Sequence, residues 1–188
     1  MKELSLHILD IVQNSIKADA TLIIIKISED LIADRLVIEI EDDGNGMSPS
    51  LLKKVTDPFV TSRDTRRIGL GLSLLKATAR QCEGDLFIES EEGKGTKVYS
   101  YFQHSHIDRA PLGKMEDTLI SLLIDNEEIN ADITSLNYVY KHQYNEESFI
   151  FDTREVKEIL GNTPLYEPDV LDWIKKYLKE NLETLVKS

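Results

Sequence analysis

The sequence predicts an α+β protein, because segments with helical periodicity alternate with segments that have the composition of β-hairpins. Residues 4–18, 72–81 and 168–186 place apolar side chains at helical spacing. Residues 21–42 and 85–102 are rich in β-branched and aromatic residues, and a short polar turn interrupts each. With 188 residues, of which 41% are apolar, the chain can form one domain with an appended segment.

The composition argues against several classes of protein. A formal net charge of −12 argues against nucleic acid or an anionic membrane surface as the main partner. The single cysteine, Cys82, excludes an intramolecular disulfide and a cysteine-built metal site, and its apolar surroundings indicate a buried thiol. No apolar run is long enough to span a bilayer, and charges interrupt residues 1–7, where a signal peptide needs an apolar core. We therefore expect a cytoplasmic protein.

The first predicted helix carries an unusual polar face opposite its apolar stripe. Residues three or four apart share a helix face, so this polar face consists of His7, Asp10, Asn14 and Lys17. The simplest interpretation is a face in contact with solvent. The alternative is that the row supplies the oxygen ligands and the positive charge that a divalent cation and a phosphate chain require.

A glycine-rich turn follows the second predicted strand, where residues 40–47 read Ile-Glu-Asp-Asp-Gly-Asn-Gly-Met. Gly44 and Gly46 allow a sharp turn and the close approach of a ligand ring. Asp42, at the strand end, can accept a hydrogen bond from that ligand. Asp-Gly and Asn-Gly are also ordinary turn sequences, so this segment alone indicates no more than a turn.

Two further segments have the composition of an anion-binding site. Residues 57–69 form a polar loop with three arginines, and this loop is either a flexible surface segment or a mobile lid that neutralises a polyphosphate. Gly69-Leu70-Gly71-Leu72 opens the next predicted helix, where the free backbone N–H groups and the helix dipole favour an anion. Residues 92–95 form the turn of the second hairpin, and Thr96 begins its return strand.

Taken together, these segments resemble the GHKL family of ATPases, which includes DNA gyrase, heat-shock chaperone ATPase domains, histidine kinases and mismatch-repair ATPases. The resemblance covers about residues 4–102. Four family boxes occur in the family order, namely the N-box at residues 10–18, the G1 box at residues 42–47, the G2 box at residues 69–72 and the G3 turn at residues 93–96. In addition, residues 58–62 resemble the F-box of histidine kinases.

The resemblance implies a two-layer α/β sandwich of the Bergerat type, with a mixed, mostly antiparallel sheet, helices on one face, and ATP between the helices and the lid. It implies that Asn14 binds Mg²⁺, which bridges the phosphates. It also implies that Asp42 accepts the exocyclic amine of adenine, which selects adenine because guanine presents a carbonyl there. The other implied nucleotide-binding residues are Lys17, Gly44, Gly46, Met47, Phe59, Thr61, Arg63, Gly69, Leu70, Gly71, Leu72 and Thr96.

Asp10 departs from the family pattern. Hydrolysing members resemble E-x-x-x-N, in which the glutamate orients the attacking water, whereas this chain has D-x-x-x-N. Aspartate is one methylene shorter, which limits its reach toward a water beside the terminal phosphate. Histidine kinases usually need no such carboxylate, so hydrolysis stays open. Our hypothesis is slow hydrolysis with Asp10 as the general base and His7, one turn away, as its partner.

Residues 105–112 resemble the kinase box S-H-x-x-R-x-P-L, which makes His106 a candidate phosphoacceptor. Two features favour the alternative, a polar linker. Ile107 stands where an acidic residue is expected, with Asp108 one place late. Gly113 and a β-like stretch follow, instead of a long helix.

The remaining residues carry no recognised motif. Their composition predicts strands and helices over residues 118–124, 133–142, 148–151, 152–160 and 168–186. The expected organisation is an ATP-binding domain, a linker and a C-terminal α+β extension, over residues 1–104, 105–116 and 117–188. The extension either continues the sheet or forms a small appendage.

The expected function is that of a regulatory ATP·Mg-binding protein that acts on another protein. The expected partners are ATP or ADP, an unidentified protein and a second copy of the chain in a homodimer, but neither nucleic acid nor membrane. One alternative is a kinase of the anti-sigma-factor type that phosphorylates a partner, or of the histidine-kinase type that phosphorylates His106. Another is a binding module that nucleotide only switches. A third alternative is a clamp-type ATPase acting on DNA, which the similarity of residues 14–20 to mismatch-repair ATPases suggests. The acidic charge and the absence of a second ATPase domain disfavour this third alternative.

Overall fold

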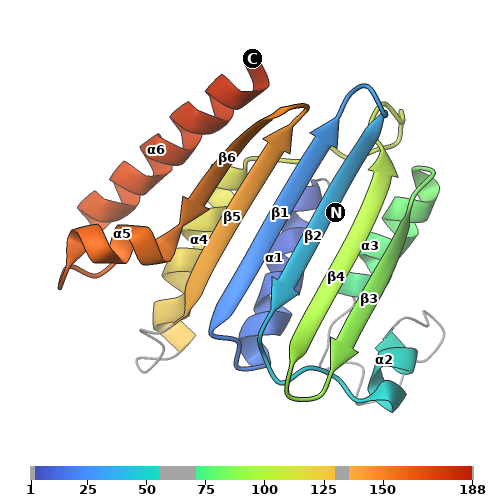
Figure 1. Ribbon diagram of the computed structural model, residues 1–188, viewed down its shortest axis with the longest axis horizontal. Coiled ribbons are helices and arrows are strands. Elements are labelled where there is room, and N and C mark those ends of the chain that lie inside the picture. The colour runs from blue at the N-terminus through green and yellow to red at the C-terminus, as the bar shows by residue number, and fades with distance from the viewer. Residues whose placement is uncertain (1–2, 56–70, 130–135, 188) are drawn as a thin grey trace.

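A six-stranded sheet forms one layer of the molecule, in the order β3-β4-β2-β1-β5-β6 (Figure 1). The computed structural model describes residues 3–55, 71–129 and 136–187, with only the backbone for residues 125–129. The strands are β1 (Leu22–Asp30), β2 (Arg35–Asp42), β3 (Asp85–Glu91), β4 (Gly95–Gln103), β5 (Asn137–Tyr144) and β6 (Glu147–Asp152). Neighbouring strands are antiparallel except β1 and β5, which run parallel. The predicted mixed, mostly antiparallel sheet is therefore confirmed.

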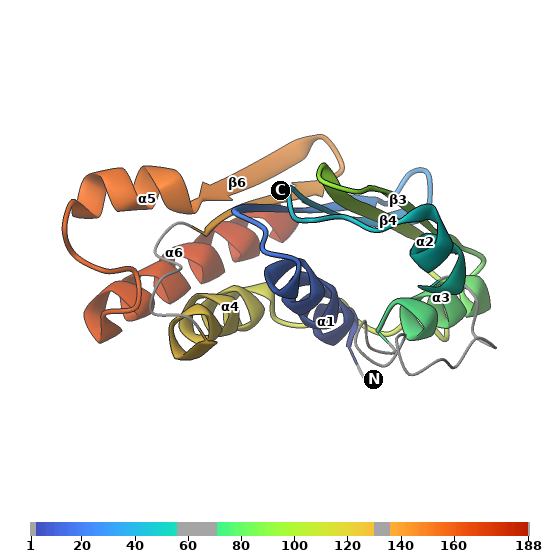
Figure 2. The same cartoon turned by 90° about the horizontal axis from the view of Figure 1, so that it is seen from below.

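Helices form the second layer. The described helices are α1 (Leu4–Lys17), α2 (Pro49–Val55), α3 (Gly71–Gln81), α4 (Met115–Ile129), α5 (Thr153–Leu160) and α6 (Pro168–Lys187). Four of them, in the order α3, α1, α4 and α6, lie side by side across one face of the sheet (Figure 2). None of the helices in the described part of the chain has the length and apolarity to cross a membrane. The two-layer α+β sandwich predicted from the sequence is confirmed.

The core lies between the two layers, where alternate strand residues point toward the helices. In β1, Ile23, Ile25 and Ile27 are buried, and the residues between them are only partly buried. The antiparallel register places Ile25 opposite Ile40 and Ile27 opposite Ile38, so both central strands present the same apolar face. This period of two explains why the hairpin over residues 21–42 could be predicted from its composition.

The helix α1 is capped by a segment far away in the sequence. Glu3 stands at its N-cap and makes no side-chain cap, so the first N–H groups need other acceptors. The N–H groups of Leu4 and Ser5 donate to the carbonyls of Pro111 and Leu112, at 2.9 and 2.8 Å. The segment that leaves β4 therefore fixes the start of α1.

The prediction of a strand over residues 118–124 is wrong, because this segment lies inside α4. Its buried side chains Met115, Leu119, Leu122 and Leu123 recur at helical spacing, so one helix face enters the core. A short apolar run fits a strand or a buried helix equally well, so the sequence of this segment could not distinguish the two.

The C-terminal segment continues the sheet, which was one of the two alternatives for it. β5 pairs with β1, and β6, which confirms the strand predicted over residues 148–151, pairs with β5. β5 begins at Asn137, so the predicted strand over residues 133–142 began too early, and residues 133–135 lie outside the described residues. The side chain of Asp152 caps α5 by accepting from the N–H of Arg154 at 2.9 Å, as the predicted helix start requires.

A buried polar cluster joins β1 to two other parts of the chain. Glu29, near the end of β1, contacts the Nε2 atoms of His104 and His142 at 2.9 Å each. The other ring nitrogen of His142 lies 2.9 Å from the hydroxyl of Tyr140. Burial alone would raise the pKa of Glu29, but the hydrogen bonds from the two histidines outweigh it and hold that pKa below its ordinary value. The cluster therefore fastens β5 and the turn after β4 to the far end of β1.

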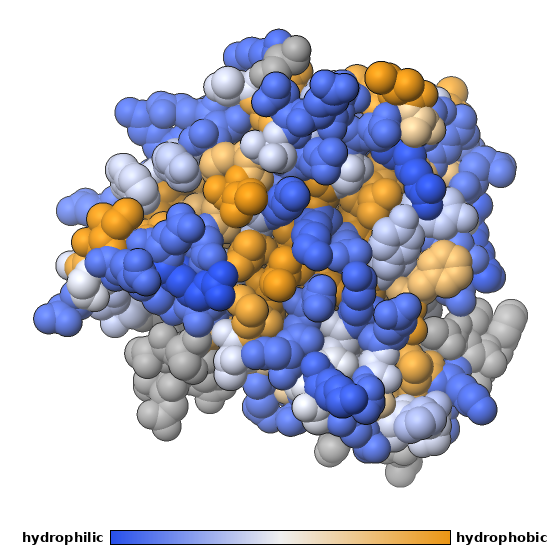
Figure 3. Space-filling model, in the orientation of Figure 1, coloured by the Kyte–Doolittle hydropathy of each residue, from blue (hydrophilic) through white to orange (hydrophobic). Residues whose placement is uncertain are grey.

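The face of the sheet away from α1, α3, α4 and α6 is turned toward the viewer in Figure 3, where apolar side chains gather over the middle of the sheet. An aromatic cluster lies on β3 and β4, where the rings of Phe87 and Tyr101 are stacked with centroids 6.5 Å apart. The guanidinium of Arg35 lies 4.4 Å from the centre of the Tyr101 ring. Cross-strand pairs of this kind stabilise the sheet on its uncovered face.

Candidate nucleotide-binding site

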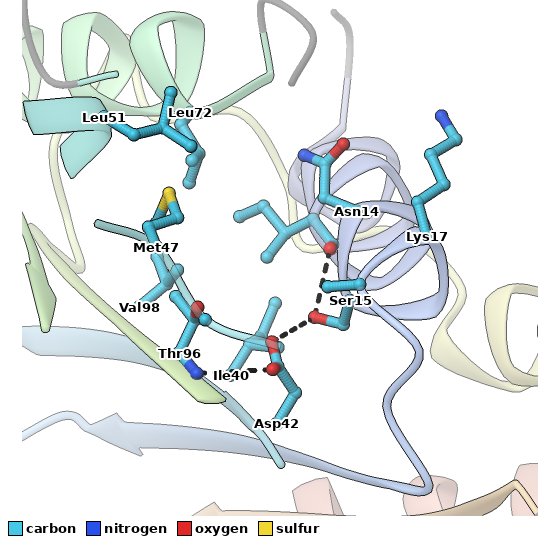
Figure 4. A pocket seen from close by; sticks show the side chains of 13 residues that line it. Asn14, Ser15, Lys17, Ile40, Asp42, Met47, Leu51, Leu72, Thr96 and Val98 are labelled. Carbon is cyan, nitrogen blue, oxygen red and sulfur yellow. Dashed lines mark hydrogen bonds between the residues drawn. The ribbon is translucent and has the colours of Figure 1, made fainter. Parts of the chain in front are cut away.

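A cavity of about 190 Å³ opens between α1, the end of β2, the start of β4 and α3. Its walls are largely apolar, with a few polar groups from α1, β2 and β4 (Figure 4). The lining residues are Ile11, Asn14, Ser15, Lys17, Ala18, Ile40, Asp42, Gly46, Met47, Leu51, Leu72, Thr96 and Val98. Ligand sites usually measure about 300–1,000 Å³, so this cavity can hold one ring of a ligand whose remainder lies outside it.

Asp42 is the buried acceptor of the cavity, with 9% of the residue exposed. The hydroxyl of Ser15 donates to its Oδ2 at 2.6 Å, and the N–H groups of Gly44 and Thr96 donate to its Oδ1 at 3.0 and 3.2 Å. A carboxylate accepts about four hydrogen bonds, so these three donors fix its orientation and leave one acceptor position for a ligand.

The next residue, Asp43, serves the fold. Its Oδ1 accepts from the N–H groups of Thr21 and Leu22 at 2.7 and 2.8 Å, and its Oδ2 accepts from the Thr21 hydroxyl at 2.6 Å. Burial raises the pKa of Asp43, but these hydrogen bonds outweigh it and lower that pKa below its ordinary value. The adjacent carboxylates therefore divide their roles, and only Asp42 faces the cavity.

The two glycines of the turn allow protein segments to approach each other closely. Gly46 has φ +65°, and a Cβ there would lie 2.0 Å from the carbonyl oxygen of Glu91. A Cβ on Gly44 would lie 2.6 Å from the carbonyl oxygen of Ala18. The sequence predicted that both glycines make room for a ligand ring. In the structure Gly46 lines the cavity, whereas Gly44 is not among the lining residues and packs against Ala18, which follows α1.

Ser90 connects the glycine turn to the second hairpin. Its hydroxyl oxygen accepts from the N–H of Met47 at 2.8 Å and lies 2.8 Å from the hydroxyl oxygen of Thr96. The Ser90 hydroxyl also lies 3.0 Å from the carbonyl oxygen of Gly95, to which it can donate. Met47 and Thr96 are thereby held on the wall of the cavity, where the sequence placed both of them.

The polar face of α1 divides between the cavity and the start of α3. Asn14 and Lys17 line the cavity mouth, opposite Met47, as Figure 4 shows. Asp10 lies one turn further along and packs against Gly71, where an added Cβ would lie 3.0 Å from the Asp10 Cβ. His7 does not belong to a solvated face, because the residue is only 2% exposed. The alternative of a face in contact with solvent is therefore wrong for His7.

The glycine-rich segment is only partly within the described residues. Gly71 is the first residue of α3, and the side chain of Leu72 lines the cavity. Leu72, the second residue of α3, therefore brings this helix to the wall of the cavity. The remaining predicted site residues, Phe59, Thr61, Arg63, Gly69 and Leu70, lie outside the described residues.

Sequence reasoning missed Ser15 and Ser90. Ser15 falls on the apolar stripe of α1, at helical spacing from Ile8 and Ile11, and a polar residue on a buried stripe was a usable signal. Ser90 carried no comparable signal, because its position depends on the pairing of β3 with β4. In the described part of the chain, no group of three or more His, Cys, Asp or Glu side chains is arranged to hold a metal ion.

His106 lies far from the cavity. It follows β4, whose other end carries Thr96 at the cavity wall, and Thr96 and Gln103 are separated by about 23 Å at the usual rise of a strand. Its Nδ1 accepts from the N–H of Asp108 at 3.1 Å within a turn. His106 therefore lies beyond the end of β4 that is away from Thr96.

The chain is thus a two-layer α+β sandwich with a fixed carboxylate in a largely apolar cavity. The family described as "Histidine kinase-, DNA gyrase B-, and HSP90-like ATPase" matches residues 2–106. The chain belongs to this family.

Several histidine kinases are similar to this part of the chain. Sensor kinase CckA of Brucella abortus is 35% identical over 89 residues, which cover 45% of this chain and 9% of the kinase. Sporulation kinase C of Bacillus subtilis is 35% identical over 88 residues, which cover 47% of this chain and 20% of the kinase. The similarity thus spans a fifth or less of these kinases. Among solved structures, full-length ShkA in complex with AMPPNP matches with a TM-score of 0.42 and 21% identity, over 52% of this chain and 20% of that one.

Proposed function

We propose that the chain binds ATP with Mg²⁺ in the cavity and acts as a regulatory, histidine-kinase-like ATPase domain on another protein. The observation that carries the proposal is the Asp42 carboxylate, whose three internal donors leave one acceptor position toward the cavity. An adenine presents an amine donor to that position, whereas a guanine would present a carbonyl. The surrounding wall of Ile40, Met47 and Val98 suits the faces of a flat ring.

The phosphates would leave the base along α1. Ser15, which contacts Asp42, and Asp10, which contacts Gly71, are separated by about 7.5 Å along the helix axis at 1.5 Å per residue. With the adenine amine at Asp42, the ribose and then the phosphates would follow α1 past Asn14 toward the start of α3. Lys17 and the N–H groups of α3 supply positive potential on this path.

The residues present fit a magnesium ion that travels with the nucleotide. Mg²⁺ keeps several waters and binds through few protein ligands plus the phosphates of the substrate, so it needs no cluster of acidic side chains. The amide oxygen of Asn14, at the cavity mouth, would be the protein ligand. When bound, the ion would neutralise charge on the phosphates.

Asp10 is our candidate for the general base of slow hydrolysis, because it packs against Gly71 at the end of the proposed phosphate path. The alternative in which His106 accepts the phosphate within one molecule is disfavoured by the length of β4. A kinase that phosphorylates a partner protein and a nucleotide-switched binding module stay as alternatives. The similarity to sporulation and sensor kinases favours the kinase-like alternatives over a DNA clamp.

Incubation with γ-labelled ATP and Mg²⁺, with wild type beside Asp42→Asn, tests this function. Released phosphate that disappears in the variant would support an ATPase. Label retained on this chain or on an added protein would support a kinase. Nucleotide binding without either signal would support a switched module, and absence of binding in the wild type would contradict the whole proposal.

A further inference from the structure

The outer edge of β6 is open in the described part of the chain. β6 is the last strand of the sheet and pairs on one side only, with β5. A two-residue turn at 145–146 joins the two strands, so Tyr144 and Glu147 close the hairpin as a hydrogen-bonded pair. The direction of the backbone groups alternates along a strand. Ser148 and Ile150 therefore direct their N–H and C=O groups away from β5, where no other described strand pairs with them.

The sequence of β6 does not protect this edge. Sheets usually protect an open edge with lysine, with proline or with a covering element. Between Glu147 and Asp152, β6 reads Ser-Phe-Ile-Phe, without a charge or a proline, and Ile150 is 56% exposed. At the other edge of the sheet, β3 carries three carboxylates and has α2 and α3 beside it. The edge of β6 is therefore the one suited to pair with a further strand.

An aromatic cluster lies beside this edge. α6 runs alongside β6 in the helix layer (Figure 1 and Figure 2). Trp173 and Tyr177 of α6 stack with ring centroids 5.4 Å apart, and the Tyr177 ring lies 5.8 Å from the ring of Phe149 on β6. Trp173 is 51% exposed and Tyr177 is 38% exposed. A strand added to β6 would direct every second side chain toward the layer that holds these rings.

The segment around the edge is acidic. Residues 146–172, which span β6, α5 and the start of α6, contain eight carboxylates and only two basic side chains, Arg154 and Lys157. Arg154 contacts Asp152 at 2.6 Å, and Lys157 donates to the carbonyl of Leu136 at 2.9 Å. Half of the formal net charge of −12 therefore lies in this segment. Such a charge disfavours a second copy of the chain at this edge and favours a basic partner.

We propose that the edge of β6 binds an extended, basic segment of a partner protein as a further strand, in which apolar residues alternate with lysine or arginine. The outward backbone groups of Ser148 and Ile150 pair with the backbone of that segment. Its apolar side chains pack on Trp173 and Tyr177, and its basic side chains are attracted by the acidic surroundings. The inference rests on the proposed function in one respect, the action on another protein, and its surface lies outside the family match at residues 2–106.

The test titrates the full chain with an acetylated peptide of about ten residues in which lysine and valine alternate, long enough to cover the strand. The fluorescence of Trp173, the single tryptophan of the chain, reports binding. Ile150→Pro removes an outward N–H and leaves the pairing with β5 in place, so we expect the affinity to fall at least about tenfold. Ile150→Ala is the matched control, because it keeps that N–H, and it should lose less than about threefold. Ser148→Pro removes the other outward N–H and carries the test if Ile150→Pro does not fold.

A peptide with glutamate in place of lysine should bind at least about tenfold more weakly than the lysine peptide. The inference would be overturned if the lysine peptide did not bind, if both peptides bound equally, or if Ile150→Pro and Ile150→Ala bound the lysine peptide equally. Sedimentation analysis that finds a dimer of the chain, abolished by Ile150→Pro, would assign the edge to a second copy and would also overturn it. ATP binding, measured separately, should be equal in the wild type and Ile150→Pro. A wild type that binds the lysine peptide but no ATP would contradict the nucleotide-binding function and leave this inference intact.

Discussion

Replacement of Ser15 by alanine removes the hydroxyl that donates to Oδ2 of Asp42 at 2.6 Å. Among the described residues, Asp42 then keeps only the backbone donors of Gly44 and Thr96, both of which contact Oδ1. Because the carboxylate is buried, the lost donor leaves Oδ2 without a partner in this part of the chain. The variant therefore perturbs both the stability of the fold and the orientation of the acceptor proposed to bind adenine.

The size of the effect follows from the contacts. A hydrogen bond to a charged group contributes about 1.5–3 kcal/mol. Because Asp42 keeps two other donors, we expect the loss in Ser15→Ala to lie at the lower end of this range, so that the free energy of unfolding falls by about 1.5 kcal/mol. For a chain of this length, that corresponds to a fall in melting temperature of about 3–6 °C. We expect the affinity for ATP to fall about tenfold, because the freed carboxylate must be ordered again on binding.

Thermal unfolding and isothermal titration calorimetry measure the two quantities. Ser100→Ala is the control, since Ser100 is fully buried on β4 and its hydroxyl lies 3.4 Å from the Ile38 carbonyl, which is a weak contact. A Ser15→Ala variant as stable as Ser100→Ala, with wild-type affinity for ATP, would refute the assigned role of Ser15.

Three further perturbations test other parts of the structure. Gly46→Ala should destabilise the fold by about 2 kcal/mol or more in urea unfolding, because the residue has φ +65° and its Cβ would meet the Glu91 carbonyl; wild-type stability would contradict the turn geometry. Glu29→Gln should cost about 1–3 kcal/mol at pH 7, because one of its two histidine contacts becomes a donor facing a donor. The pKa of the Glu29 carboxyl is lowered in the fold from 4.5, so the stability that the ionised carboxylate adds is present above pH 4.5 and is lost as the pH falls through the folded pKa. A difference in the free energy of unfolding between the wild type and Glu29→Gln that persists below that pH would contradict this assignment. The pKa of His7 is lowered from 6.5, so at pH values below about 6.5 the unfolded chain binds a proton more readily than the folded chain, and the wild type loses stability. The melting temperature of His7→Leu relative to the wild type should therefore rise as the pH falls from 7.5 to 5.5. A constant difference would count against a buried neutral imidazole.

The elements with a clear period could be predicted from the sequence. The hairpin of β1 and β2 alternates buried and partly buried residues, and α1 carries its apolar stripe at helical spacing, so both agree with their predictions. α4 was missed because its short apolar run fits either period, and the choice between them depends on packing against α1 and α6.

The residues of the candidate site likewise fall into those that could be predicted from the sequence and those that could not. Asp42 was predicted because its glycine-rich segment occurs in order with the other boxes that resemble the GHKL family, and the structure adds the three donors that fix its carboxylate. Ser90 could not be predicted, because the contact with Met47 arises only when β3 pairs with β4. The burial of His7 was also beyond the sequence, since it depends on α3 packing across the start of α1.

The most direct test of the central claim is equilibrium binding of ATP and GTP, with Mg²⁺, to the wild type and to Asp42→Asn. Asparagine keeps the size of the side chain and can still accept from Gly44 and Thr96 through its oxygen, but it can turn an N–H donor toward the base. We predict that the wild type binds ATP at least about a hundredfold more tightly than GTP and that Asp42→Asn, still folded by thermal unfolding, loses most of that preference. Equal binding of ATP and GTP by the wild type, or an unchanged preference in Asp42→Asn, would contradict the account.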